Sequence, residues 1–182
     1  FDQYMYPYYK MDMDKGTITR EFAQELMDCI WVKLNDLNKC RDAASAEGFA
    51  GYSLFQNLIA GGQDIHGKDA TNDLSFMCIT ASIHVHLPQP SLSVRVWNKT
   101  PHDLMLHAAK LTRTGIGLPA YYNDEVIIPA MMSVGVSLQD ARSYNIIGCV
   151  EPSTPGKTDG WHDAAFFNMC RPLEMVFSNG YE

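Results

Sequence analysis

The chain has 182 residues and a formal net charge of −7, with 46% hydrophobic and only 19% charged residues. This balance excludes nucleic acid and an anionic membrane as main partners, since both bind clustered Lys and Arg side chains. The five cysteines are scattered and never form a Cys-x-x-Cys spacing, so neither a zinc site nor a disulfide framework is indicated. We therefore expect one apolar core, reduced thiols and a cytoplasmic location.

The two ends of the sequence predict that it is a segment of a longer protein. It begins at Phe1 without an initiator Met and stops at Glu182, just after an apolar helical pattern. No signal-peptide pattern occurs between these ends, and no apolar run is long enough to span a bilayer.

The helical spacing of apolar residues predicts two helices in the first half of the chain. The first spans Ile18 to Asn38, with Thr19 as its N-cap. The second begins at the Thr71-Asn72-Asp73 cluster and ends before Pro88. Between the two helices, residues 43–67 are rich in glycine and small side chains around a short apolar run, which predicts loop or strand.

Strands and helices alternate in the second half. The predicted elements are a strand over Ser93–Trp97, a helix from a Thr100 cap to Gly115, a strand over Leu118–Tyr122, a helix from Asp124, a short helix from a capping box at Ser137–Asp140, a strand over Ile146–Val150, and a helix over Asp163–Ser178 that Pro172 kinks or breaks. Strands separated by helices predict parallel βαβ units. Because no glycine-rich phosphate motif follows a strand, an α/β barrel or part of one is the better prediction, with its chemistry at the C-terminal strand ends.

The sequence Gly148-Cys149-Val150-Glu151-Pro152 places a thiol and a carboxylate two residues apart at the end of the last predicted strand. Alternation along a strand would point both side chains to one face and into one pocket. The alternative is a small buried cysteine beside a solvated glutamate. A nearby carboxylate raises the pKa of a thiol and disfavours a thiolate nucleophile. The pair therefore fits a sulfur that moves a hydrogen atom while Glu151 moves a proton.

Trp161-His162-Asp163 follows a loop punctuated by glycines, at the start of the last predicted helix. Asp163 is either the N-cap of that helix or part of an acid–base pair that faces the Cys149 pocket. His162 is the partner that Cys149 would need if it were a nucleophile. His84 and His86 flank one valine on a predicted helix, where they do not converge, so no metal site is predicted.

Together these motifs resemble the catalytic region of glycyl radical enzymes. The matching segments are Gly148–Pro152, Pro155–Thr158 and Gly160–Asn168, with Phe55–Asn57, Gly61–Gln63, Asp69–Ser75, Leu87–Arg95 and Pro119–Asp124 upstream of them. The resemblance covers most of the chain without a large gap.

This resemblance implies an α/β fold, a ten-stranded barrel of two antiparallel half-barrels surrounded by helices. Residues 1–182 would be an internal segment of this pyruvate formate-lyase-like barrel domain, with the C-terminal glycyl radical domain absent. The implied cofactor is a protein-based glycyl radical on a residue outside this segment, with no metal or B12 in the enzyme itself. The implied partners are a small-molecule substrate, a radical S-adenosylmethionine activating enzyme and a second copy in a homodimer. The implied location is the cytoplasm of an anaerobic bacterium, with a bacterial microcompartment as an alternative.

The resemblance also implies a role for each site residue. Cys149 would carry a thiyl radical, and Glu151 would be the general base. Asp163 and His162 would bind the substrate, Asp163 through the substrate hydroxyl groups. Phe55 aligns with a position in the pocket wall that varies with the substrate. The implied activity is that of a dehydratase that eliminates water from a small 1,2-diol such as glycerol or propane-1,2-diol.

Several alternatives stay open at the level of the sequence. Gly148, in place of a second cysteine, disfavours the acetyl transfer of pyruvate formate-lyase itself. Ser153-Thr154 and Cys170-Arg171-Pro172 depart from the diol dehydratase pattern. The alternatives within the family are a hydroxyproline dehydratase, a choline trimethylamine-lyase, an isethionate sulfite-lyase and an arylacetate decarboxylase. From a different class, the chain could be a non-catalytic scaffold domain with Cys149 as a structural thiol.

Overall fold

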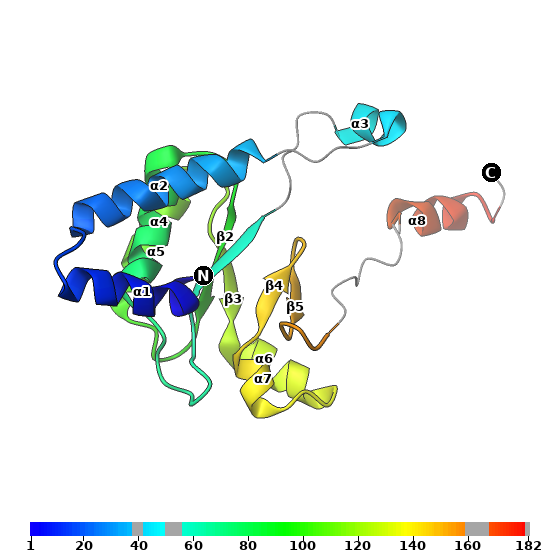
Figure 1. The fold of residues 1–182 in the computed structure, drawn as a ribbon. Coiled ribbons are helices and arrows are strands. Elements are labelled where there is room, and N and C mark those ends of the chain that lie inside the picture. The colour runs from blue at the N-terminus through cyan, green and yellow to red at the C-terminus, as the bar shows by residue number, and fades with distance from the viewer. Residues whose placement is uncertain (38–41, 50–55, 159–167, 181–182) are drawn as a thin grey trace.

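The computed structural model describes residues 1–37, 42–49, 56–158 and 168–180. The elements in this part of the chain (Figure 1) are α1 (Asp2–Asp14), α2 (Arg20–Asp36), α3 (Ala43–Phe49), β1 (Asn57–Gly61), α4 (Asp73–Val85), β2 (Ser91–Val96), α5 (His102–Arg113), β3 (Ala120–Asn123), α6 (Asp124–Ser133), α7 (Leu138–Arg142), β4 (Asn145–Ile147), β5 (Glu151–Ser153) and α8 (Cys170–Phe177).

Strands β1, β2 and β3 form a parallel sheet in that order. Ile59 of β1 pairs with Ser93 of β2, and Val94 of β2 pairs with Tyr121 of β3. Helix α4 connects β1 to β2, and α5 connects β2 to β3, so the chain forms two consecutive βαβ units. The parallel α/β arrangement that the alternation predicts is therefore confirmed.

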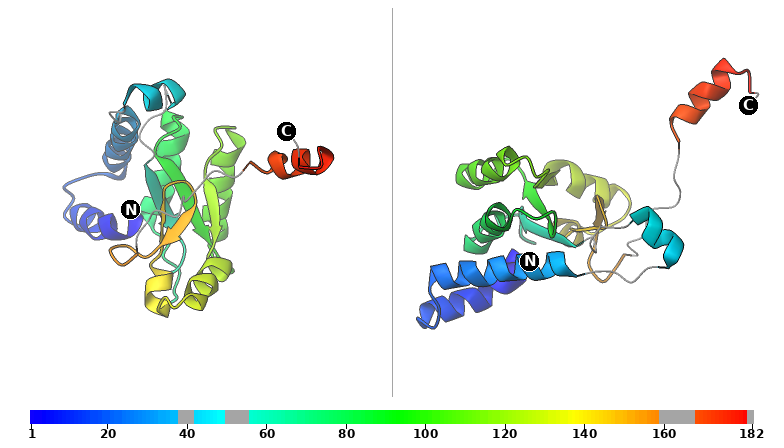
Figure 2. Two further views of the ribbon diagram at one scale, coloured as in Figure 1. Left: turned by 90° about the vertical axis from the view of Figure 1, so that its right-hand side faces the viewer. Right: turned by 90° about the horizontal axis from the view of Figure 1, so that it is seen from above.

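One face of this sheet is apolar and covered by helices. Helix α4 contacts β1, β2 and α5, and α2 packs on α4. In the view from above, the blue and green helices lie on one side of the molecule and the orange hairpin lies across from them (Figure 2). The cluster under the helices includes Trp31, Met77, Leu92, Val94 and Leu104, each at most 1% exposed. This face holds the main hydrophobic core.

The opposite face of the sheet carries polar side chains. Side chains alternate along a strand, so Ser93 and Arg95 point away from the helices that Leu92 and Val94 contact. Both polar residues are nevertheless buried. The strand register places Asn57 of β1 and Tyr122 of β3 on the same side. We call these four residues, Asn57, Ser93, Arg95 and Tyr122, the polar face.

The antiparallel β4–β5 hairpin packs against this polar face. Strand β4 contacts β1, and Tyr144 and Ile146 join a second apolar cluster with Tyr122. The single strand predicted over Ile146–Val150 is wrong, because β4 ends at Ile147 and residues 148–150 form a turn. Gly148 has a φ of +57°, a left-handed conformation that ends the extended strand.

Predicted helix starts are confirmed where the expected side chain caps the helix. Thr19 accepts a hydrogen bond from the Phe22 N–H at the start of α2, and Asn72 forms a capping box at the start of α4. The predicted Thr100 cap of α5 is wrong. The Thr100 hydroxyl instead accepts a hydrogen bond from the Trp97 N–H at 2.8 Å, inside the turn that precedes the helix.

Helix α1 and helix α3 are not predicted by the apolar spacing. Asp2 anchors α1, because its buried carboxylate accepts hydrogen bonds from the Gly61 N–H at 2.9 Å and the Ser75 hydroxyl at 2.5 Å. Residues 43–49 form α3 where loop or strand was expected, whereas the apolar run at residues 57–61 does form a strand.

The first five residues of the helix predicted over Asp163–Ser178 lie outside the described residues, and its described part is helical only from Cys170. Helix α8 starts at Cys170, so Pro172 lies in its first turn. Backbone N–H groups in the first turn have no acceptor within the helix, so the absence of an N–H in proline costs no hydrogen bond there. Within the described ranges, the five strands form one three-stranded sheet and one hairpin and do not close into a barrel. None of the helices described is long and apolar enough to cross a membrane.

Candidate active site

Cys149 lies in the turn between β4 and β5, and its side chain is exposed. The sequence predicts that alternation along one strand points Cys149 and Glu151 to a common face. The predicted geometry is wrong, because Cys149 belongs to the turn and Glu151 begins β5. Both residues instead lie in the β4–β5 hairpin, Cys149 in its three-residue turn and Glu151 at the first position of β5.

Glu151 is half-buried and pairs with Ile147 across the hairpin. Its carboxylate lies directly against Gly148, where a Cβ atom added to the glycine would collide with Glu151 Oε2. The glycine therefore has two functions in this turn. It supplies the positive φ, and it leaves the space that the carboxylate occupies.

Two consecutive backbone carbonyls of the turn accept hydrogen bonds from the polar face. The Asn57 side-chain amide donates to the Gly148 carbonyl. The Tyr122 hydroxyl donates to the Cys149 carbonyl at 3.3 Å. Burial and the nearby Cys149 thiol raise the pKa of Tyr122, so its hydroxyl stays a neutral donor. The backbone that carries the thiol is thus tied to two strands of the sheet.

A buried ion pair fixes the residue that leads into the hairpin. Arg95 donates from Nε and Nη2 to the two Asp124 carboxylate oxygens, both at 2.8 Å. Asp124 also accepts hydrogen bonds from the Tyr144 hydroxyl and the Gln63 N–H, both at 2.9 Å. The Arg95 guanidinium lies 4.0 Å from the centre of the Tyr144 ring. Burial raises the pKa of Tyr144, which keeps its hydroxyl protonated.

Polar contacts also hold the chain that leaves the hairpin. The Ser153 hydroxyl donates to Asn145 Oδ1 at 2.6 Å, which joins the two ends of the hairpin. Further along, the Lys157 ammonium contacts both Asp140 carboxylate oxygens at 2.8 and 2.9 Å. This pair is largely exposed and is screened by solvent, so it orients the loop more than it stabilises the fold.

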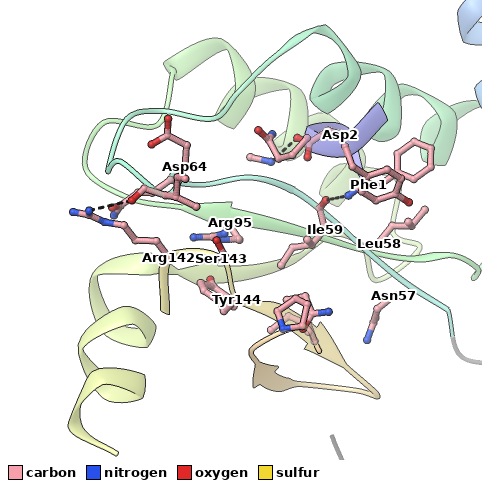
Figure 3. Close-up of a pocket in the computed structure, with 18 residues that line it drawn as sticks. Phe1, Asp2, Asn57, Leu58, Ile59, Asp64, Arg95, Arg142, Ser143 and Tyr144 are labelled. Carbon is pink, nitrogen blue, oxygen red and sulfur yellow. Dashed lines mark hydrogen bonds between the residues drawn. The ribbon is translucent and has the colours of Figure 1, made fainter. Parts of the chain in front are cut away.

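A cavity of about 530 Å³ lies at the base of the hairpin. Figure 3 shows Asp2, Ile59, Arg95 and Tyr144 among the residues that line it, with Asn57 at one end. Neither Cys149 nor Glu151 lines this cavity. It separates the start of α1 and β1 from the segment that enters β4.

Three of the site residues predicted from the sequence lie outside the described residues. These are Phe55, His162 and Asp163. The two that are described, Cys149 and Glu151, are on one hairpin. Cys78 differs sharply from Cys149, because it is buried in the helix-covered core and burial raises the pKa of its thiol. Within the described ranges, no group of three or more His, Cys, Asp or Glu residues could hold a metal ion.

Sequence reasoning missed the residues that support the turn. Asn57 lies in a stretch read as loop or strand, and Tyr122 ends a predicted strand with nothing to mark its hydroxyl. Arg95 did carry a signal, because a charged residue inside a β-branched strand needs a buried partner. The sequence marks its partner Asp124 only as the start of a helix.

An α/β fold that carries a thiol and a carboxylate on one hairpin agrees with the resemblance to glycyl radical enzymes. A family model described as "Pyruvate formate lyase-like" matches residues 1–182, and the chain therefore belongs to that family.

Three relatives are similar over nearly the whole chain. A solved structure from Roseburia inulinivorans that concerns 1,2-propanediol dehydration is 77% identical, with a TM-score of 0.92 over 100% of this chain and 23% of that one. The B12-independent glycerol dehydratase from Clostridium butyricum, in its glycerol-bound form, is 63% identical, with a TM-score of 0.89 and the same coverage. The (2S)-3-sulfopropanediol dehydratase of Klebsiella oxytoca is 39% identical over 98% of this chain and 22% of its own length. The chain thus spans less than a quarter of the relatives that it matches.

Proposed function

We propose that the protein to which this chain belongs is a glycyl radical dehydratase that removes water from a small 1,2-diol, propane-1,2-diol or glycerol. The observation that carries the proposal is the hairpin turn that presents Cys149 two residues before Glu151. The 77% and 63% identities to proteins that concern 1,2-propanediol and glycerol support the diol as the substrate class. The ten-stranded barrel is part of the same proposal for the whole protein.

Cys149 carries the hydrogen atom in this mechanism. Its thiol is exposed on a turn, so substrate and other parts of the protein can reach it. The family's cofactor is a protein-based glycyl radical outside this chain, which a radical S-adenosylmethionine activating enzyme installs. This radical would accept the hydrogen atom of the Cys149 S–H bond and leave a thiyl on the sulfur. The Cys149 sulfur, as a thiyl, then takes the hydrogen atom from C1 of the diol, and its S–H bond re-forms.

Glu151 carries the proton. Its carboxylate accepts the proton of the C1 hydroxyl group while the C2–O bond breaks, and the departing hydroxide takes that proton and leaves as water. The remaining organic radical has a carbonyl at C1 and its unpaired electron at C2. It takes a hydrogen atom back from Cys149, which restores the thiyl. One diol thus gives one aldehyde and one water, with no external oxidant or reductant.

The other predicted site residues complete this proposal. Asp163 would hold the substrate hydroxyl groups with His162 beside it, and Phe55 would form part of the pocket wall. The protein would act as a homodimer in the cytoplasm of an anaerobic bacterium, or in a microcompartment there.

A substrate screen of the full-length protein tests the proposed reaction. The protein is activated anaerobically by its radical S-adenosylmethionine enzyme and given propane-1,2-diol, glycerol, hydroxyproline, choline or isethionate in separate reactions. We expect propanal from propane-1,2-diol or 3-hydroxypropanal from glycerol. Turnover of a non-diol alone would contradict the diol and favour another C–X lyase, whereas no turnover of any substrate by radical-loaded protein would favour the scaffold.

A further inference from the structure

We propose that Asn57 and Tyr122 are positioning residues that hold the backbone of the catalytic turn and thereby aim the Cys149 thiol. This inference rests on the proposed function, because it assigns these two residues to the same reaction. We call the pair the carbonyl clamp. Neither side chain acts on the substrate in this proposal; both act through the Gly148 and Cys149 carbonyls.

The two residues of the clamp bind the turn from the strands on either side of the central strand β2. Asn57 is the first residue of β1 and pairs with Ser91, whereas Tyr122 lies in β3 and pairs with Arg95. The two donors therefore lie diagonally across the sheet, with β2 between them. They bind two adjacent carbonyls, those of Gly148 and Cys149. A turn held at one carbonyl can still pivot about that hydrogen bond, and a second hydrogen bond at the adjacent carbonyl restricts this pivoting.

Holding these carbonyls fixes the orientation of the side chain between them. Each carbonyl belongs to a planar peptide unit, so the two hydrogen bonds set the planes on both sides of the Cys149 Cα. The Cα–Cβ direction and the reach of the sulfur follow from those planes. Hydrogen-atom transfer needs the donor and acceptor in near contact, and a misplacement of about 1 Å can cost about 100-fold in rate.

Burial restricts the position of the Tyr122 ring in the clamp. Tyr122 is 9% exposed and packs with Ile146 and Tyr144 of the segment that enters the hairpin. The phenol ring is thus fixed by packing, and only its hydroxyl is free to serve the turn. Removing that oxygen should release the turn without disturbing the sheet.

The neighbouring tyrosine provides a matched control. Tyr121 lies next to Tyr122 in β3 but points to the helix-covered face, where its hydroxyl forms a hydrogen bond with the Thr112 hydroxyl at 2.8 Å. Tyr121→Phe and Tyr122→Phe each remove one phenolic oxygen and one hydrogen bond from the same strand. Only the second touches the catalytic turn.

The test compares these variants in the activated full-length protein. We measure the glycyl radical content by electron paramagnetic resonance, kcat and KM with propane-1,2-diol, and the isotope effect with the diol deuterated at C1. For Tyr122→Phe we expect an unchanged radical content, a KM within twofold, a kcat lower by about 10- to 100-fold and a larger isotope effect. Tyr121→Phe should match the wild type in all four.

Asn57→Asp adds a second, independent variant, because it keeps the size of the side chain and removes its donor. The double variant Asn57→Asp/Tyr122→Phe should lose less than the product of the two single losses, since both residues hold one turn. A Tyr122→Phe enzyme with wild-type kcat and isotope effect would overturn the clamp. So would a Tyr121→Phe enzyme with the same losses, which would mean a general effect on the strand.

Amide hydrogen exchange separates failure of the clamp from failure of the proposed function. The peptide that spans residues 145–153 should exchange faster in Tyr122→Phe than in wild type or Tyr121→Phe, whether or not the protein dehydrates a diol. If the peptide exchanges faster in Tyr122→Phe but the wild type does not turn over a diol, the result supports the clamp and contradicts the proposed reaction. Unchanged exchange would remove the clamp.

Discussion

The two faces of the β1–β2–β3 sheet are built on different physical principles. The helix-covered face is held by apolar burial, with Leu92 and Val94 fully buried under α4 and α5. The polar face is held by directed contacts, among them the Arg95–Asp124 pair and the hydrogen bonds from Asn57 and Tyr122 to the turn. Apolar burial tolerates small changes of position, whereas hydrogen bonds fix angles. The hairpin that bears Cys149 packs against the face with directed contacts.

The comparison predicts that stability and activity depend on opposite sides of the same strands. Substitutions on the helix-covered face should lower the free energy of unfolding and leave the chemistry of the folded protein unchanged. Substitutions in the turn should change the free energy of unfolding little and lower the activity of the folded protein. The buried ion pair belongs to the polar face, yet it should affect stability most, because it supports the whole base of the hairpin.

The largest effect is expected from Asp124→Asn. Arg95 would keep its charge inside the protein without a carboxylate partner, which costs about 3–5 kcal/mol. The urea midpoint of the full-length protein measures this loss. Asp140→Asn, which removes the charge that faces the exposed Lys157, is the control and should lower the midpoint far less than Asp124→Asn. Equal midpoints for the two variants would refute the distinction between buried and exposed pairs.

A smaller loss of stability is expected from Leu92→Ala on the helix-covered face. Truncation of this fully buried side chain leaves a cavity and should cost about 2–5 kcal/mol. The kcat per radical-loaded subunit should stay at the wild-type value, since Leu92 points away from the turn. A drop in kcat at equal radical content would mean that the two faces are not independent.

The smallest effect on stability, but a clear effect on activity, is expected from Gly148→Ala. The left-handed backbone costs about 1–2 kcal/mol for a residue with a Cβ, and that Cβ displaces the Glu151 carboxylate. We expect kcat to fall by about tenfold or more with an unchanged radical content. Gly156→Ala is the matched control, because Gly156 also has a positive φ but no atom within 4 Å of an added Cβ. Equal kcat values for the two variants would contradict the role of Gly148.

The helices of the helix-covered face can be predicted from the sequence, because their apolar spacing and caps involve residues that are close together in the chain. The helical recurrence of Trp31 and Met27 in α2 and the Asn72 cap of α4 depend on residues within a few positions of each other. The polar face depends on distant pairs. Arg95 and Asp124 are 29 residues apart, and Asn57 and Gly148 are 91 residues apart. No periodicity encodes such pairs.

The candidate site shows the same division. A short motif and its resemblance to a family predict the roles of Cys149 and Glu151. The geometry assigned to them was wrong, because alternation was extended through Gly148, whose positive φ turns the chain. A glycine directly before the motif was the available signal for a turn. The roles of Phe55, His162 and Asp163 stay predictions.

The central claim is that Cys149 moves the hydrogen atom and Glu151 moves the proton. Aldehyde formation by activated, full-length Cys149→Ala and Glu151→Gln, measured beside the glycyl radical signal, tests it most directly. The account predicts that both variants keep the radical signal, since neither residue is needed to install it, and that neither forms aldehyde from the diol. Aldehyde formation at the wild-type rate by either variant would contradict the account.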